Sequence, residues 1–413
     1  MNLTVQPGKL RGTVTAPASK SQAHRAMICA AFSGGETHII CRGIPEDIKA
    51  TARGLKALGA QVTFTEEGLS ITPVKTAACA GEKIRSFDCG ESGSTLRFMI
   101  PLIGLDGSRT QITMRGRLKD RPMDVFINEL TAHGMHFEKK DALLTVSGAL
   151  ESGTFTLPGN VSSQYISALL MALPLLKDPG ELVVTTAESS APYIDMTRDT
   201  MRAFGVHVTK EESRYILPAA GRYTSPGTYR VEGDWSNAAF WMAAAALGSD
   251  IEVTGVCDES VQGDRVVRDF TARILNPDTA EEETVIAIDA SPDLLPVLAV
   301  TACASGRDTV FTGAGRLRDK ESDRLASTEA MLRALGGDVT TTEDTMTVRS
   351  LGGEPLSGGT VDACGDHRIE MSAAVAATIA RGPVTIKGAG TMSKSYPAFW
   401  EDYRSLGGQF TWE

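Results

Sequence analysis

Residues Pro17 to Phe32 have the sequence Pro-Ala-Ser-Lys-Ser-Gln-Ala-His-Arg-Ala-Met-Ile-Cys-Ala-Ala-Phe, and the rest of the chain repeats the pattern that they begin. A short polar segment, Ser19-Lys20-Ser21, precedes apolar residues at helical spacing, so we expect a helix to begin here. A serine can cap this helix, and Lys20 and Arg25 lie in its first turns. Backbone N–H groups, the positive end of the helix dipole and two cations therefore meet at one place, which suits a phosphate or a carboxylate. The alternative is an ordinary capped helix with solvated cations.

The same succession of elements returns along the chain at intervals of roughly 70 residues, which indicates an internal repeat. Each copy has a polar or glycine-rich loop, a first helix, a strand, a second helix and further strands. The six loops that open the first helices are expected at residues 19–21, 89–95, 158–164, 232–237, 289–293 and 364–368. In the fourth copy the second helix, expected over 265–275, runs directly into Asn276-Pro277-Asp278, so this copy is predicted to be truncated.

Six such units predict an α/β protein with two domains of three units each. A repeat of this kind can also form a solenoid. However, the similar loops before the first helices favour two compact lobes, with the helix N-termini facing a shared cleft. The turn Ser225-Pro226-Gly227-Thr228, near the middle of the chain, is the first candidate for the seam.

The composition is typical of a globular protein with more than one core. The chain has 413 residues, more than one hydrophobic core usually serves. Its net charge of −10 disfavours nucleic acid and membrane surfaces as partners. Seven cysteines without a Cys-x-x-Cys pair are typical of reduced thiols. The start has no signal pattern and no apolar stretch reaches about 18 residues, so we expect a cytoplasmic location.

Basic residues recur near the predicted helix entrances. Pro122 is expected at the first position of a helix, with Arg121 as its cap. Lys320 and Arg324 are four residues apart, so we expect them on one face of a helix. The whole set, which favours a pair of anionic ligands, is Lys20, Arg25, Arg121, Lys320, Arg324, Arg368 and Lys394.

Asp293 and Glu321 are acidic residues at comparable places. A carboxylate among dense cations stays ionised and can act as a base if a proton lies within hydrogen-bond reach. For Asp293 a helix-capping role is an equal alternative, because aspartate is among the best caps.

Taken together, these residues resemble the 5-enolpyruvylshikimate-3-phosphate (EPSP) synthase family over essentially the full length of the chain. The motifs that carry the resemblance are Ser19-Lys20-Ser21 with Arg25, Gly93 with Arg97, Arg121-Pro122, the segment 158–164, Pro192-Tyr193-Ile194-Asp195, the segment 320–325, Asp366-His367-Arg368 and Lys394. The resemblance implies a two-lobed enolpyruvyl transferase fold in which each lobe contains three copies of a β-α-β-α-β-β unit. The chain would cross twice, which replaces the seam at 225–228: residues 1–16 and 229–413 would form one lobe and residues 17–228 the other.

The resemblance also implies the substrates and the residues that hold them. Shikimate 3-phosphate would contact Lys20, Ser21, Arg25, Ser162, Ser163, Gln164, Ser190, Asp293 and Lys320. Phosphoenolpyruvate would contact Lys20, Gly93, Arg121, Gln164, Arg324, Arg368 and Lys394. The catalytic residues would be Lys20, Asp293, Glu321 and Lys394. Which carboxylate moves which proton stays open, and no metal or other cofactor is implied.

Some positions depart from the family pattern. Glu91 stands where many members have Asn, Phe98 where many have Pro, Ala191 where Lys is frequent, and Arg316 where Asn is common. Gly93 is kept, which predicts sensitivity to glyphosate, the family's inhibitor. The resemblance further implies a monomer that binds no nucleic acid and no membrane.

Two alternatives remain. UDP-N-acetylglucosamine enolpyruvyl transferase has the same fold and donor, but that family places a reactive cysteine in a loop of its first-half lobe. A catalytically inactive anion-binding protein could also use these repeats, although the presence of Lys20, Asp293, Glu321 and Lys394 argues against it.

Overall fold

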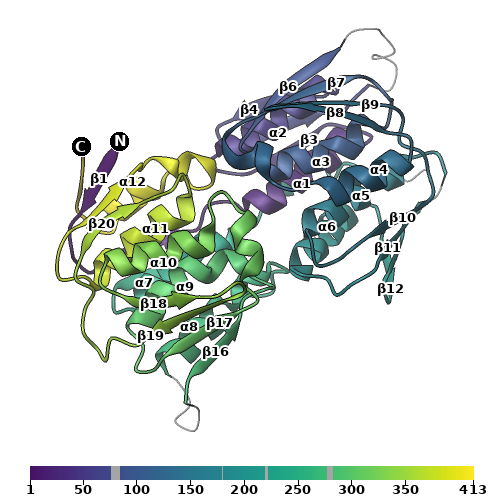
Figure 1. Cartoon of the computed structure of the whole chain (residues 1–413). Coiled ribbons are helices and arrows are strands. Elements are labelled where there is room, and N and C mark those ends of the chain that lie inside the picture. The colour runs from purple at the N-terminus through teal and green to yellow at the C-terminus, as the bar shows by residue number, and fades with distance from the viewer. Residues whose placement is uncertain (76–83, 179, 219–221, 277–281) are drawn as a thin grey trace. The chain divides into compact units, whose positions relative to one another are not determined.

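The structure, a computed structural model, describes residues 1–75, 84–178, 180–218, 222–276 and 282–413. Cys79 and Pro277-Asp278 lie outside the described residues. The chain divides into two compact units (Figure 1). The first unit contains Met1–Pro17 and Gly233–Glu413, and the second unit contains Ala18–Glu232.

The described part of the second unit contains three four-stranded sheets, ordered β14-β3-β5-β4, β6-β7-β9-β8 and β10-β11-β13-β12. Its strands are β3 (Thr37–Ile40), β4 (Gln61–Thr65), β5 (Gly68–Thr72), β6 (Arg85–Gly90), β7 (Thr110–Met114), β8 (His136–Lys140), β9 (Leu143–Ser147), β10 (Thr154–Leu157), β11 (Glu181–Val184), β12 (Thr209–Glu211), β13 (Arg214–Ile216) and β14 (Thr228–Arg230). Its helices are α1 (Lys20–Ala31), α2 (Glu46–Ala57), α3 (Gly93–Ile103), α4 (Asp124–Ala132), α5 (Ser163–Ala172) and α6 (Ala191–Ala203), with the 3-10 helices η1 (Gly116–Asp120) and η2 (Leu173–Leu175).

The described part of the first unit contains two four-stranded sheets, ordered β20-β21-β1-β22 and β16-β17-β19-β18, and the pair β15-β2. Its strands are β1 (Asn2–Val5), β2 (Arg11–Thr15), β15 (Asp250–Thr254), β16 (Thr284–Ala287), β17 (Thr309–Thr312), β18 (Asp338–Thr341), β19 (Thr345–Arg349), β20 (Gly359–Asp362), β21 (Val384–Lys387) and β22 (Phe410–Trp412). Its helices are α7 (Trp235–Ala246), α8 (Val267–Leu275), α9 (Leu295–Cys303), α10 (Arg324–Ala334), α11 (His367–Ala376) and α12 (Phe399–Ser405), with the 3-10 helices η3 (Gly263–Val266), η4 (Pro292–Leu294), η5 (Gly315–Asp319), η6 (Ala377–Ile379) and η7 (Thr391–Lys394).

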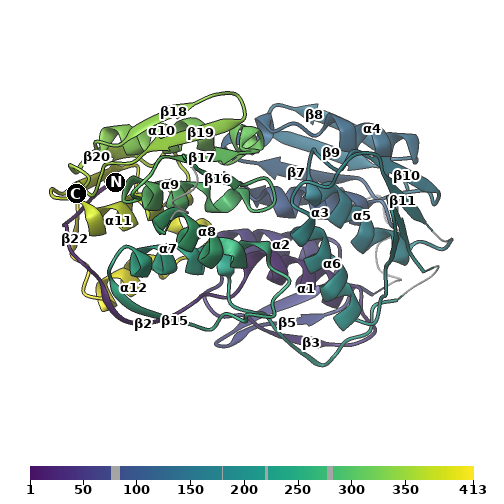
Figure 2. The same cartoon turned by 90° about the horizontal axis from the view of Figure 1, so that it is seen from below.

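The sheets confirm the repeat. Each four-stranded sheet starts with a parallel pair, such as β6 with β7, and continues with two antiparallel strands, such as β9 and β8. The fourth copy is truncated as predicted, because β15 pairs only with β2 among the described strands (Figure 2). The chain also crosses between units: β1 joins β21 and β22 beside the C-terminus, and β14 pairs with β3 (Figure 1).

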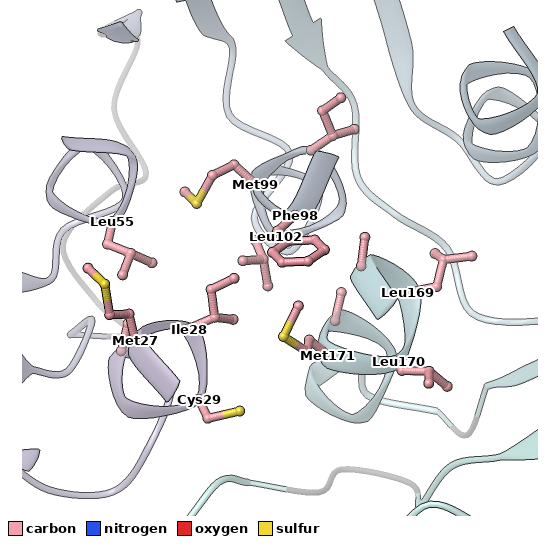
Figure 3. Packing of buried hydrophobic residues seen from close by; sticks show 14 of the residues in the cluster. Met27, Ile28, Cys29, Leu55, Phe98, Met99, Leu102, Leu169, Leu170 and Met171 are labelled. Atoms are coloured by element: carbon pink, nitrogen blue, oxygen red, sulfur yellow. The ribbon is translucent and has the colours of Figure 1, made fainter. Parts of the chain in front are cut away.

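The first helix of each copy lies inside its unit. In α1, α3 and α5 nearly every residue is buried, including polar residues near their starts such as Arg25 and Arg97. Their later turns are apolar or small on all sides and can be covered only by other elements. Figure 3 shows Ile28 of α1, Phe98 and Leu102 of α3 and Met171 of α5 packed against one another. The inner helices of the first unit, α7, α9 and α11, are buried in the same way.

Candidate functional site

The N-terminal halves of the three inner helices in the second unit contact one another. Arg25 of α1 donates to Ser167 of α5, with its Nη2 3.3 Å from the Oγ atom. Arg97 of α3 donates to Gln164 of α5, with its Nη1 2.6 Å from Oε1. Because these residues lie within two turns of the helix starts, the positive ends of three helix dipoles come together, which favours an anion there.

Lys20 is the first residue of α1, and Ser19 is the N-cap, whose Oγ accepts from the backbone N–H of Gln22 at 3.4 Å. The Lys20 Nζ atom lies 2.9 Å from Oδ2 of Asp47 in the first turn of α2. Both side chains keep 16% of their surface exposed, so an anionic ligand can compete with Asp47 for the ammonium group.

Arg25 is a buried cation surrounded by neutral groups. Its guanidinium donates to Ser21 O at 2.6 Å, Thr197 Oγ1 at 2.6 Å, Tyr193 O at 3.0 Å and Ser167 Oγ at 3.3 Å. Its carbon centre lies 5.1 Å from the ring centre of Phe98, one of the positions that depart from the family pattern. Burial lowers the pKa of Arg25 to about 10, so the group is still charged at neutral pH. None of the described carboxylates forms an ion pair with it, and a bound anion would supply the missing negative charge.

Gly93 opens α3 beneath two guanidinium groups. A Cβ atom at this position would lie 2.7 Å from Nη1 of Arg97 and 2.9 Å from Nη1 of Arg121. Gln164 joins the group, since its Oε1 accepts from Arg97 and its Nε2 donates to Ser94 Oγ at 3.0 Å. The structure therefore brings Gly93, Arg121 and Gln164 together as a cationic cradle that a side chain at position 93 would obstruct.

The loop that carries Arg121 differs from its prediction. Helix α4 begins at Asp124 with Met123 as its N-cap, so Arg121 does not cap it; Arg121 follows η1. The hydroxyl of Tyr165 donates to Pro122 O at 2.6 Å and holds this loop against α5. Glu91, another departure from the family pattern, packs on the start of η1, because a Cβ at Gly116 would lie 2.6 Å from its Oε2.

The serines expected to bind a ligand lie at helix starts. Ser162 is the N-cap of α5, where its Oγ accepts from the N–H of Gln164 at 3.3 Å, and Ser163 is the first helical residue. Ser190 is the N-cap of α6 in a left-handed conformation, with φ 58° and ψ 39°. A non-glycine residue is rarely held in this region, and such strain is common at binding sites. Ser21 lies in the first turn of α1.

In the first unit, Asp293 is the centre of a cluster of cations. Its carboxylate lies 2.7 Å from Arg324 Nη1, 2.9 Å from Arg368 Nη2 and 3.4 Å from Lys320 Nζ. It does not cap a helix, because it lies inside η4, whose N-cap is Ser291, and the N-cap of α9 is Leu294. Burial raises the pKa of the Asp293 carboxyl, but Arg368, Lys320 and Arg324 lower it by more and hold it well below its ordinary value. Asp293 is therefore ionised at neutral pH.

Arg324 is almost completely buried and bonds three carboxylates. Its guanidinium donates to Asp293, to Glu321 Oε2 at 2.5 Å, and to Asp366 Oδ2 at 2.9 Å. Asp366 is itself inaccessible and caps α11 by accepting from Arg368 N at 2.9 Å. Burial raises the pKa of Asp366, but the charge and the hydrogen bond of Arg324, together with His367, hold it below its ordinary value, so the Asp366 carboxyl is ionised beside Arg324.

Two predicted helix positions in this unit are wrong. Helix α10 begins at Arg324, because Asp323 caps it by accepting from Ala326 N at 3.0 Å, so Lys320 lies in the loop after η5 rather than on the helix. Lys394 ends η7 instead of beginning a helix, and its Nζ donates to Gly365 O at 2.8 Å, next to the cap of α11.

Some residues of these clusters were missed as site residues from the sequence. Asp366 and Arg97 belong to motifs that the sequence shows, but their contacts with Arg324 and Gln164 cross between elements. Asp47 and Thr197, which contact Lys20 and Arg25, have no local signal of their own.

In the described part of the chain, no three or more His, Cys, Asp or Glu residues are grouped so that they could hold a metal ion. Among the described helices, none is long and apolar enough to cross a membrane.

Comparison with known proteins shows which family the chain is similar to. Residues 5–403 match the family EPSP synthase (3-phosphoshikimate 1-carboxyvinyltransferase). The chain is 39% identical to a 3-phosphoshikimate 1-carboxyvinyltransferase of Clostridium perfringens over 98% of both chains, and 37% identical to one of Clostridium kluyveri over 98% of this chain and 97% of the relative. A solved structure of EPSP synthase from Acinetobacter baumannii has the same fold, with a TM-score of 0.80, 24% identity and complete coverage of both chains. The chain therefore belongs to the EPSP synthase family.

Proposed function

We propose that the chain transfers the enolpyruvyl group of phosphoenolpyruvate to the 5-hydroxyl of shikimate 3-phosphate, which releases phosphate and serves the shikimate pathway to aromatic amino acids. The observation that carries this proposal is the pair of cationic clusters at helix starts of a chain from this family. Arg97 and Arg121 converge over Gly93 in the second unit, and three cations meet Asp293 in the first. Both substrates are multiply charged anions, which such clusters recognise.

The likeness to the family assigns a ligand to each of the following residues. Shikimate 3-phosphate is held by Lys20, Ser21, Arg25, Ser162, Ser163, Gln164, Ser190, Asp293 and Lys320. Phosphoenolpyruvate is held by Lys20, Gly93, Arg121, Gln164, Arg324, Arg368 and Lys394. Several of these cations pair with carboxylates in the structure, among them Lys20 with Asp47 and Arg324 with Asp293. The negative charge of the two ligands would compete with these carboxylates for the cations.

Asp293 accepts the proton of the 5-hydroxyl as the oxygen attacks the central carbon of the enol, with Lys20 and Lys394 in support. A carboxylate whose pKa is held low by three cations is a weak base. When the anionic substrates take over part of those contacts, the proton affinity of Asp293 rises toward the value that a base needs.

Glu321 delivers a proton to the methylene carbon and recovers it when the tetrahedral adduct expels phosphate. Its carboxyl accepts from Arg324, so a titratable carboxyl and a cation lie together at this place, and Glu321 acts as the acid in its protonated form. The surrounding cations stabilise the phosphate as it leaves, a preorganised electrostatic effect.

The reaction is tested by phosphate release from phosphoenolpyruvate. We expect release with shikimate 3-phosphate and none when phosphoenolpyruvate is incubated alone with the chain. Release with UDP-N-acetylglucosamine instead would identify the other transferase. Binding of shikimate 3-phosphate without any release would identify an inactive anion-binding protein.

The cysteines of the second unit disfavour the UDP-N-acetylglucosamine reaction. A reactive cysteine needs an exposed thiol of low pKa. Cys29, Cys41 and Cys89 are buried, and burial raises the pKa of Cys41 and of Cys89 to about 12 and that of Cys29 further. Of the described cysteines in this unit, none is therefore suited to such a role.

Glyphosate inhibition depends on the space above Gly93. We expect wild-type turnover to be inhibited by glyphosate, and we expect Gly93→Ala to raise both the inhibition constant and the KM for phosphoenolpyruvate by about tenfold or more. The new methyl group would push Arg97 and Arg121 apart, and small displacements of positioned groups cost rate and affinity. Steady-state inhibition kinetics on both proteins give the comparison, with Gly34→Ala as a control in the same unit, where a Cβ atom would meet nothing within 4 Å. Equal constants for Gly93→Ala and the wild type would contradict the assigned role of the cradle.

We also propose that the chain works as a monomer in the cytoplasm. Every group assigned above comes from one chain, and the cysteines that the structure describes are free thiols, as in reducing compartments. Light scattering during gel filtration would measure the mass directly, and a dimer would contradict the first part of the proposal.

A further inference from the structure

Glu370 is a buried carboxylate outside the residues assigned above. It lies in the first turns of α11, and its side chain has no exposed surface. Its oxygens accept from Gly390 N at 3.0 Å, Thr391 N at 2.9 Å, Thr391 Oγ1 at 2.6 Å and Trp400 Nε1 at 2.8 Å. No described cation forms an ion pair with Glu370, so dipoles alone compensate its charge.

A buried charge is costly unless its hydrogen bonds are complete. Three of the four donors that complete them belong to Gly390 and Thr391, in the chain between β21 and α12, and the fourth, Trp400 Nε1, belongs to α12; none comes from α11 itself. Gly390 has a φ of +105°, a conformation that side chains rarely adopt, and it presents its N–H group to both oxygens of Glu370. Glu370 therefore fixes the backbone at the start of η7.

The segment that Glu370 holds ends in Lys394. Its other attachment to α11 is the Lys394 side chain, which donates to Gly365 O at 2.8 Å. The start of α11 also carries Asp366, which bonds Arg324, and Arg368, which bonds Asp293. One helix start thus controls the positions of Arg324, Asp293 and Lys394.

We propose that Glu370 is a positioning residue of the transfer reaction: it holds residues 390–394 on α11 so that Lys394 keeps its place at Gly365, next to the start of that helix. This inference rests on the function proposed above, in which Lys394 contacts phosphoenolpyruvate. Glu370 itself touches neither substrate and acts through the backbone of Gly390 and Thr391.

Glu370→Gln tests the proposal with little change of shape. Glutamine has one acceptor oxygen and one NH₂ group, so part of the donor set would lose its acceptor. We expect kcat/KM for phosphoenolpyruvate to fall about tenfold to a hundredfold, the effect of a displacement near 1 Å. Affinity for shikimate 3-phosphate alone should change by less than about threefold, because Lys394 is not among the groups assigned to it.

Two further readouts separate positioning from general stability. Hydrogen exchange of the Gly390 and Thr391 amides should accelerate in Glu370→Gln, whereas exchange in α10 should not. In a Lys394→Met background, Glu370→Gln should lower kcat/KM by less than about threefold. When one residue acts through another, the effects of the two substitutions do not add. If Glu370→Gln lowers kcat/KM by the same factor in the Lys394→Met background as in the wild type, the proposal is overturned.

Glu329→Gln is the matched control, because Glu329 lies on α10 of the same unit. Its Oε1 atom pairs with Nη2 of Arg333 at 2.8 Å rather than with any of residues 390–394. It should keep wild-type kinetics. If Glu370→Gln does not fold, Thr391→Val removes one donor from the same carboxylate and should lower kcat/KM severalfold; wild-type kinetics in either variant would refute the inference. An inactive wild-type chain would instead refute the proposed function, so the two failures are distinguishable.

Discussion

Arg324→Met is expected to abolish measurable turnover and to destabilise the first unit at the same time. The guanidinium is 1% exposed and pairs with Asp293, Glu321 and Asp366. Without it, Asp366 remains as a buried charge with no strong cation beside it, and breaking a buried pair in this way costs about 3–5 kcal/mol. Loss of a preorganised charge at the reacting group costs about 10²–10³ in rate.

Denaturant unfolding and phosphate release measure the two effects. Arg333→Met is the control: it removes an arginine from the same helix, but one whose side chain is 57% exposed, and should change stability by less than about 1 kcal/mol. The pH dependence gives a further check. In the wild type the pKa values of Asp293 and Asp366 lie below their ordinary range, so their contribution to stability is complete above about pH 4 and is lost as the pH falls through the folded-state values.

In Arg324→Met, Asp366 loses the cation that lowers its pKa most, and Asp293 loses one of three such cations, so the stability deficit of the variant should shrink as the pH falls toward 4. A variant with wild-type stability at neutral pH would contradict the inference that Arg324 compensates the buried Asp366.

Arg25→Met is expected to have the opposite balance: a large loss of binding with a small change in stability. We expect affinity for shikimate 3-phosphate to fall about a hundredfold or more, because hydrogen bonds between charged groups contribute about 1.5–3 kcal/mol each. The free energy of unfolding should fall by less than about 2 kcal/mol. The variant loses the hydrogen bonds of Arg25 to its neutral partners, but it also avoids the cost of burying a charge, and the two effects partly cancel.

Isothermal titration with shikimate 3-phosphate and denaturant unfolding would measure both quantities. Arg202→Met, on the exposed face of α6, is the control and should bind as the wild type does. Unchanged affinity in Arg25→Met would contradict the role of this guanidinium, and a loss of stability as large as that of Arg324→Met would contradict its neutral surroundings.

The repeat could be predicted from the sequence because its signals are local. Ser19, Ser92 and Ser162 cap the inner helices of the second unit, and Asp234 and Asp366 do so in the first. The strands Asp250–Thr254, Thr309–Thr312 and Val384–Lys387 each follow the inner helix of their copy, as the repeat predicts. Caps and alternation act over a few residues, so one sequence is enough to recognise them.

Contacts across elements could not be predicted in this way. Arg324 bonds Asp366, which is 42 residues away, and Arg97 bonds Gln164, which is 67 residues away. Spacing predicts Lys320 on a helix, and Pro122 predicts Arg121 as a helix cap. Both residues instead follow 3-10 turns, because Asp323 and Met123 are the helix caps. The lobe boundaries at 16/17 and 228/229 and the substrate contacts of the named residues stay predictions.

A crystal structure of the Glu321→Gln variant grown with shikimate 3-phosphate and phosphoenolpyruvate would test most directly whether basic side chains from both units act on one pair of anions. We expect Lys20, Arg121, Arg324 and Lys394 all to contact the same phosphoenolpyruvate molecule. Ligands held by one unit alone, with the other unit's cations on unrelated surfaces, would contradict it.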